Sequence, residues 1–201
     1  MKKINVVRIA AIFTLSAFIM PANIYAQEKE NKQEQKEDKD ESKAGKLVDD
    51  SKHARDEFIK TDGLMKNLFE KSPGYVIFPN IGKGAIGVGG AAGNGIVYEN
   101  GEAVGMAKMK QASIGFQLGG QAYREVIFFE NAEALNRFKQ NKFEFSAQAS
   151  AVAVTAGAAA NVKYREGVMV FTQEKGGLMY EASIGGQKFS YKPLDEGNAK
   201  K

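Results

Sequence analysis

Four basic residues of this sequence are the best candidates for binding chemistry. Lys83, Lys108 and Lys110 lie within, and Arg124 just after, a segment (residues 74–120) that holds thirteen of the 22 glycines. Ammonium and guanidinium groups attract phosphate, and backbone N–H groups left open by glycine can assist them. The pattern makes them candidates for a lipid-binding contact with anionic headgroups at a membrane surface, although the residues alone favour the simpler interpretation that they solubilise the chain.

The residues that most enzymes use are scarce. His53 is the single histidine and the chain has no cysteine, which excludes a metal cluster built from several of either. The acidic residues Asp49, Asp50, Asp56 and Glu57 alternate with basic ones, as is typical of a solvated helix face. A pair of these carboxylates in an acid–base enzyme is the alternative. We therefore predict no catalytic residue, no metal and no enzymatic activity.

Residues 82–87 match the dinucleotide-binding pattern G-x-G-x-x-G, and Glu102 follows Gly82 at a suitable distance. That pattern binds a pyrophosphate only where a helix begins directly after it. Here more glycine follows, and then the β-forming residues 96–98 and a turn. The glycines are therefore predicted to bend strands, and no cofactor is expected.

The N-terminus has the pattern of a secretory signal peptide, residues 1–26. Lys2, Lys3 and Arg8 precede an uncharged run from Ile9 to Met20, and Ala26 stands at the expected cleavage position. An uncleaved membrane anchor is the alternative. Cleavage leaves 25 basic and 24 acidic residues, too even a balance for a nucleic-acid-binding protein. The sequence thus predicts an exported protein, periplasmic or extracellular and possibly membrane-associated.

Helices are expected at the start of the mature chain. Residues 27–46 are polar and highly charged, which predicts a disordered tether, with a solvated helix as the alternative. Residues 47–60 place Leu47, Ser51, Ala54 and Phe58 on one stripe of a helix. A second short helix is expected after Asp62 as its N-cap.

From Tyr75 onward the pattern alternates as in β-strands. Strands are expected at 75–79, 85–88, 95–99, 103–109, 112–118, 123–129, 143–151, 168–172, 178–184 and 187–191. Asn100-Gly101 and Gly185-Gly186 are the expected turns, and Asn131 is expected to cap a helix over 132–140. The alanine-rich run 147–160 is too short and too polar to span a membrane. The predicted fold is α+β: a mainly antiparallel, sheet-wrapped or barrel-like domain with N-terminal helices and one short internal helix.

Several spaced motifs resemble the SYLF domain family. They are YVIFPNIGKG at 75–84, GVGG at 87–90, ASIGFQLGGQ at 112–121, VIFF at 126–129, AQASA at 147–151 and GGLMYEASIGG at 176–186. The resemblance covers roughly residues 47–192, leaving 193–201 as a polar tail, and this chain looks like an exported bacterial member. The resemblance implies phospholipid binding, actin binding in some members, and no enzymatic activity.

Two features depart from the family pattern. The chain has no tryptophan, with Val104-Gly105-Met106 standing where one is common, and the helix over 46–60 is electroneutral. Phosphoinositide specificity and actin binding are therefore not expected. The leading hypothesis is a non-enzymatic, phospholipid-associating protein of the cell envelope. The second is an envelope structural or protein-interaction module without lipid specificity.

Overall fold

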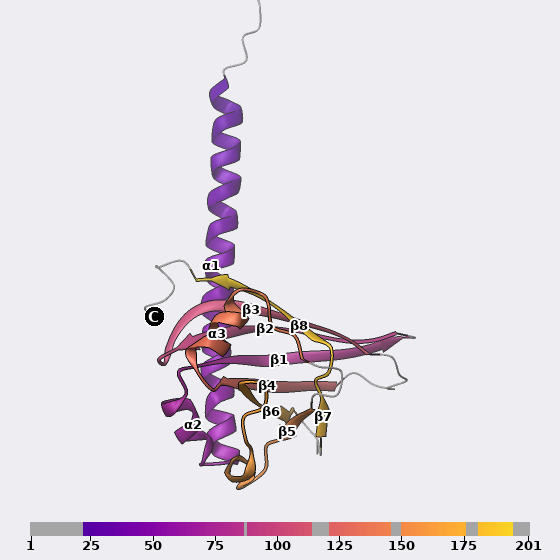
Figure 1. Ribbon diagram of the computed structural model, residues 1–201. Helices are drawn as coiled ribbons and strands as arrows, with labels where there is room; N and C mark the ends of the chain where they lie inside the picture. Colours follow the sequence, from indigo (N-terminus) through magenta and orange to yellow (C-terminus); the bar gives the residue numbers. More distant parts are fainter. Residues whose placement is uncertain (1–21, 87, 114–120, 146–149, 176–180, 195–201) are drawn as a thin grey trace, which may run out of the picture. The chain divides into compact units, whose positions relative to one another are not determined.

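The computed structural model describes residues 22–86, 88–113, 121–145, 150–175 and 181–194. Figure 1 shows a curved sheet with helices packed against it. The helices are α1 (Ala22–Thr61), α2 (Met65–Lys71), α3 (Ala132–Lys139) and a short 3-10 turn η1 (Ala158–Asn161). The strands are β1 (Gly74–Ile86), β2 (Val88–Glu99), β3 (Glu102–Ser113), β4 (Gln121–Phe129), β5 (Ser150–Ala153), β6 (Val168–Glu174), β7 (Glu181–Ser183) and β8 (Gln187–Pro193).

The strands form one sheet in the order β7-β5-β6-β4-β1-β2-β3-β8. Every neighbouring pair is antiparallel except β5 and β6. The predicted α+β class with a mainly antiparallel, wrapped sheet is therefore confirmed. The described pairs leave β7 and β8 at the two ends of the sheet, so it is wrapped and not closed into a barrel.

The first hairpin is longer than predicted. β1 and β2 stay paired from Gly74↔Glu99 out to Ile86↔Val88, where separate short strands were expected. The register shifts between Ile77 and Asn80, where Pro79 has no N–H to donate to a ladder. Because Gly82 lies inside β1, and β1 is followed by β2 and not by a helix, the segment lacks the helix N-terminus that dinucleotide binding requires.

The inner face of the sheet holds a core of aromatic side chains. Phe78 of β1, Phe189 of β8 and Phe138 of α3 converge, with Phe138 and Phe189 ring centroids 5.2 Å apart. Phe143 and Phe145, predicted to lie in a strand, are buried in the same core but lie outside any described strand, and β5 is described over Ser150–Ala153. The helix α3 lies against this core. As predicted, Asn131 caps it, accepting the Ala134 N–H at 2.9 Å, and Leu135 and Phe138 are buried.

The outer face is covered by α1 and α2. The predicted stripe is confirmed, since Ser51, Ala54 and Phe58 are buried and Leu47 is partly buried. Ser51 shares a short hydrogen bond with the hydroxyl of Tyr98, whose ring stacks on Tyr75 with centroids 4.9 Å apart. These contacts fix the helix on the first hairpin.

Two N-terminal predictions differ from the structure in detail. The tract 27–46, for which a disordered tether was favoured over a helix, is helical as part of α1; its glutamates and lysines are good helix formers. The compact unit begins at Lys39, and Ala44 is already buried. Asp62 is not the N-cap of α2, which is Leu64. Its carboxylate instead accepts backbone N–H groups from two neighbouring turns.

The expected turn at Asn100-Gly101 is confirmed, with φ of 52° and 84° at the two residues. Gly186, with φ of 73°, turns the chain into β8. Parts of the predicted strands at 112–118, 143–151 and 178–184, and most of the predicted signal peptide, lie outside the described residues.

Candidate membrane-contact surface

Four exposed lysines lie together on the outward side of β3 and β8. We call them the lysine row: Lys108, Lys110, Lys188 and Lys192. In β3 they alternate with the buried Ala107 and Met109, and in β8 with the buried Phe189 and the half-buried Tyr191. Since side chains of a strand alternate between its faces, burial of these neighbours in the inner core directs the lysines outward.

The pairing register sets the spacing of the row. Lys110 lies directly opposite Lys188, Lys108 opposite Ser190, and Met106 opposite Lys192. Directly opposite residues of an antiparallel pair have Cβ atoms about 5 Å apart, and like charges there are destabilising. The Lys110–Lys188 pair therefore has an electrostatic cost in the folded protein.

Among the residues that the structure describes, little negative charge lies next to the row. On the β2 side, Lys108 faces Asn94 and Lys110 faces Ala92, both exposed and uncharged. Among the described residues, the one ion pair of the row joins Lys188 to Glu144 at 3.6 Å, with side chains 72% and 54% exposed. Such exposed pairs contribute little, so the row keeps a positive field.

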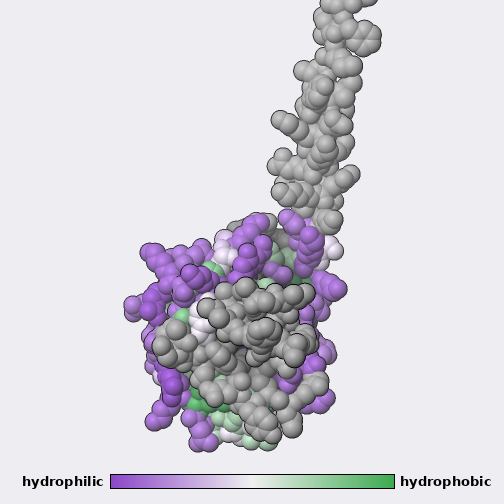
Figure 2. All heavy atoms as spheres, turned by 90° about the vertical axis from the view of Figure 1, so that its right-hand side faces the viewer, coloured by the Kyte–Doolittle hydropathy of each residue, from purple (hydrophilic) through white to green (hydrophobic). Residues whose placement is uncertain are grey.

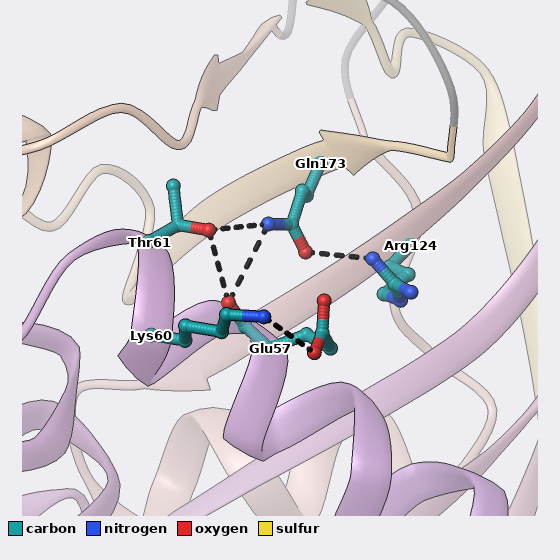
Figure 3. A network of polar contacts seen from close by, with 5 residues as sticks. All are labelled: Glu57, Lys60, Thr61, Arg124 and Gln173. Carbon is teal, nitrogen blue, oxygen red and sulfur yellow. Dashed lines mark hydrogen bonds and ion pairs between the residues drawn. The ribbon is translucent and has the colours of Figure 1, made fainter.

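Arg124 is not part of this row. It lies on β4, separated from β3 by β1 and β2. Figure 3 shows its guanidinium donating to Oε1 of Gln173 at 2.9 Å. The Gln173 amide in turn donates to Thr61 Oγ1 at 2.7 Å, so Arg124 belongs to a network that joins β4, β6 and the end of α1.

Lys83 lies in β1, opposite Ala91 of β2 and Gln121 of β4. Its side chain is outside the described part of the structure. Of the four predicted residues, the structure thus brings together Lys108 and Lys110.

Lys188 and Lys192 were missed in the sequence. The signal for Lys188 was available, because it alternates with apolar residues in the strand predicted at 187–191. What the sequence does not contain is the pairing of β8 with β3, which are separated by more than 70 residues and become neighbours only in the sheet.

A buried carboxylate was also not predicted from the sequence. Glu125 of β4 is fully buried and accepts the Gln187 amide N–H at 3.1 Å. Burial, and then the nearby charge of Glu125, raise the pKa of Tyr123 well above its usual range. These groups are buried on the inner face of the sheet and are not exposed to solvent.

The acidic residues of α1 behave as a solvated face. Asp49, Asp56 and Glu57 form ion pairs with Lys52, Arg55 and Lys60 at 3.6–3.9 Å, and His53 is exposed. In the part of the chain that the structure describes, acidic residues and the histidine nowhere gather in a group able to hold a metal ion. No helix within the same described residues has the length and apolarity needed to cross a membrane.

Comparison with known proteins adds an independent finding. Residues 110–195 match the family described as Ysc84: Las17-binding protein actin regulator. The resemblance to the SYLF (Ysc84) family is thereby confirmed over this segment, which includes three residues of the lysine row and begins at Lys110. The motifs at 75–90 lie outside the matched segment.

The chain is also similar to Beta cell expansion factor A from Aeromonas veronii, with 28% identity over 125 residues. The alignment covers 62% of this chain and 48% of that protein, so the chain spans about half the length of this relative.

Proposed function

We propose that this chain is an exported, non-enzymatic protein that associates with anionic phospholipid surfaces through the lysine row. The observation that carries the proposal is the face of β3 and β8, on which Lys108, Lys110, Lys188 and Lys192 are exposed together. Each basic residue near an anionic membrane contributes about 1 kcal/mol. Four together give about 4 kcal/mol, which corresponds to weak and reversible binding.

The cost of the arrangement supports a role in binding. A direct Lys110–Lys188 pair does not help the fold, because like charges repel across a ladder. An anionic surface would neutralise both charges at once. The match to the Ysc84 family is consistent with a lipid-binding or actin-regulator-like role without catalysis, and the lysine row favours the first of these.

Vesicle sedimentation tests the proposal. The exported protein, purified from producing cells, is expected to pellet with vesicles rich in an anionic phospholipid and to remain in solution with neutral phosphatidylcholine vesicles. Binding should weaken as salt rises, because exposed charges are screened over about 10 Å at 0.1 M. Equal pelleting with neutral and anionic vesicles would overturn the proposal.

A matched pair of variants isolates the row. Lys108→Gln with Lys110→Gln should lower the affinity for anionic vesicles about thirtyfold, since two charges worth about 1 kcal/mol each are lost from the surface. Lys71→Gln with Lys175→Gln removes the same charge from exposed lysines away from β3 and β8 and should leave pelleting unchanged. Equal effects of the two variants would show that net charge, and not the row, determines binding.

The export part of the proposal has its own measurement. The intact mass of the purified protein is expected to correspond to a chain that begins at Gln27. A mass that includes residues 1–26 would contradict cleavage after Ala26.

A further inference from the structure

A second surface of the domain is apolar and exposed. We call it the apolar tip: Leu64 together with residues 156–160, Ala-Gly-Ala-Ala-Ala. Leu64 is 44% exposed, and with Val152 it is one of two exposed large hydrophobic residues among those described. Ala156, Gly157 and Ala160 are also exposed.

One carboxylate holds the two parts of the tip side by side. Oδ1 of Asp62 accepts the Leu64 N–H at 3.1 Å, and Oδ2 accepts the Ala159 N–H at 2.8 Å. Asp62 itself is 3% exposed. Val154, Ala159 and Val162 pack into the outer core and fix the loop, while Ala156 and Ala160 are exposed.

The tip is free of charge but flanked by basic residues. No charged residue occurs from Phe145 to Val162. Lys60 and Lys66 stand on either side of Leu64, and Lys163 follows Val162; all three are exposed. Glu57 and Glu70 pair with Lys60 and Lys66 at 3.8 Å, which leaves Lys163 as the net positive charge of this flank.

A lipid bilayer suits this surface better than a protein partner does. Binding hot spots of protein interfaces are rich in Trp, Tyr and Arg, whereas the exposed part of the tip consists of one leucine and small residues. Shallow contact with the interface of a bilayer needs an apolar surface without charge and basic residues beside it. We propose that the apolar tip inserts into the interfacial region of an anionic bilayer, as a contact separate from the lysine row.

The figures show that the two surfaces are distinct. Figure 1 draws the segment between β5 and β6 at the lower end of the body, and β3 and β8 at its upper side. In Figure 2, hydrophobic residues gather at the lower end of the body. The inference shares with the proposed function only the assumption that the partner is a bilayer, so the two can be tested separately.

The sequence makes a clean optical test possible because it has no tryptophan. In the variant Leu64→Trp the single indole should shift its emission to shorter wavelength on anionic vesicles. Vesicles that carry brominated acyl chains should quench this emission, as expected for a side chain in the headgroup–acyl boundary. The control is Asn136→Trp, at an exposed position of α3 away from the tip, whose emission should not change.

A second variant measures the contribution of the tip to binding. Leu64→Glu places a charge on an already exposed side chain, and circular dichroism checks that the fold is kept. It should weaken vesicle binding about tenfold, because charge in the interfacial region opposes insertion.

The outcomes separate the two proposals. If Leu64→Trp keeps the emission of a water-exposed indole while the protein pellets with anionic vesicles in a salt-dependent way, the tip inference is wrong and the proposed function stands. If no form of the protein pellets with anionic vesicles, both are wrong. If Leu64→Glu pellets as well as the unchanged protein, the tip inference is likewise overturned.

Discussion

Lys110 of β3 lies directly opposite Lys188 of β8, and Lys188 has Glu144 as its neighbour on the other side. Replacing one of these lysines by glutamate turns a repulsive cross-strand pair into an attractive one, worth about 0.2–1 kcal/mol. We therefore expect Lys110→Glu to raise the free energy of unfolding in urea, and at the same time to weaken pelleting with anionic vesicles. An increase in stability together with a loss of binding would mark the row as a binding surface.

The control for this experiment is Lys71→Glu, the same charge change at an exposed helix residue outside the sheet. It should leave pelleting unchanged and should lower, not raise, the free energy of unfolding, by about 0.3–1 kcal/mol, because Lys71 lies in the last turn of α2. The interpretation fails if Lys110→Glu binds vesicles as tightly as the unchanged protein.

Two glycines of the first hairpin should respond differently to a methyl group. A Cβ at Gly95 would lie 2.6 Å from the carbonyl oxygen of Ile77, and backbone cannot easily move there. A Cβ at Gly82 would have nothing within 4 Å. Gly95→Ala should therefore lower the free energy of unfolding by about 1–3 kcal/mol, whereas Gly82→Ala should leave it nearly unchanged. Similar urea midpoints for the two variants would contradict this account of the close strand packing.

The Asp62 carboxylate should be a larger stabilising group than its place in a surface turn would indicate. Asp62→Ala leaves the N–H groups of Leu64 and Ala159 without their acceptor, at a cost of about 1–3 kcal/mol. Asp62→Asn keeps one acceptor oxygen, so its free energy of unfolding in urea should lie between that of the unchanged protein and that of Asp62→Ala. If Asp62→Ala is as stable as the unchanged protein, the carboxylate does not hold the loop.

Alkaline pH should destabilise the fold through its buried tyrosines. Burial raises the pKa of Tyr75, Tyr98 and Tyr123 above the ordinary 10.0. Above that pH the unfolded chain releases phenolic protons that the folded chain keeps. The free energy of unfolding is therefore highest below about pH 10 and falls as the pH rises above it. Each such tyrosine contributes a slope of about 1.4 kcal/mol per pH unit.

Urea unfolding at a series of pH values between about 8 and 11 measures this slope, a range centred near the ordinary tyrosine pKa. Tyr123→Phe should make it shallower, because one titrating group is removed. Identical slopes for the two proteins would contradict the role assigned to Tyr123.

Local patterns in the sequence predicted those features that depend on near neighbours. The Asn100-Gly101 turn, the Asn131 cap and the stripe of α1 follow from residues within a few positions of one another. The length of the first hairpin was harder to predict, because Gly82 and Gly84 weaken the alternating pattern although they remain paired with Ala92 and Gly90.

The candidate site was predicted in part for the same reason. Lys108 and Lys110 stand two residues apart in one strand, which the sequence reveals. Their neighbours Lys188 and Lys192 come from a strand at the other end of the domain, and Arg124 was assigned to a surface although Gln173 binds it. The position of the two lysines and the contact of Arg124 both depend on pairing between distant strands, which a single sequence does not specify.

The lysine row and the apolar tip lie toward opposite ends of the body in Figure 1, so one flat bilayer is not expected to touch both. A protein that uses both contacts should hold two bilayers together. We expect anionic vesicles to cluster when the protein is added, with a rise in particle size by dynamic light scattering that is reversed by salt.

The variants assign clustering to its two surfaces. Leu64→Glu should retain part of the binding and lose clustering, because only the row remains. Lys71→Gln with Lys175→Gln should cluster vesicles like the unchanged protein. Sedimentation velocity without vesicles must show a monomer, since a dimer would present two lysine rows and could join vesicles without the tip. Clustering that survives Leu64→Glu in a monomeric protein would contradict a bridge built from these two surfaces.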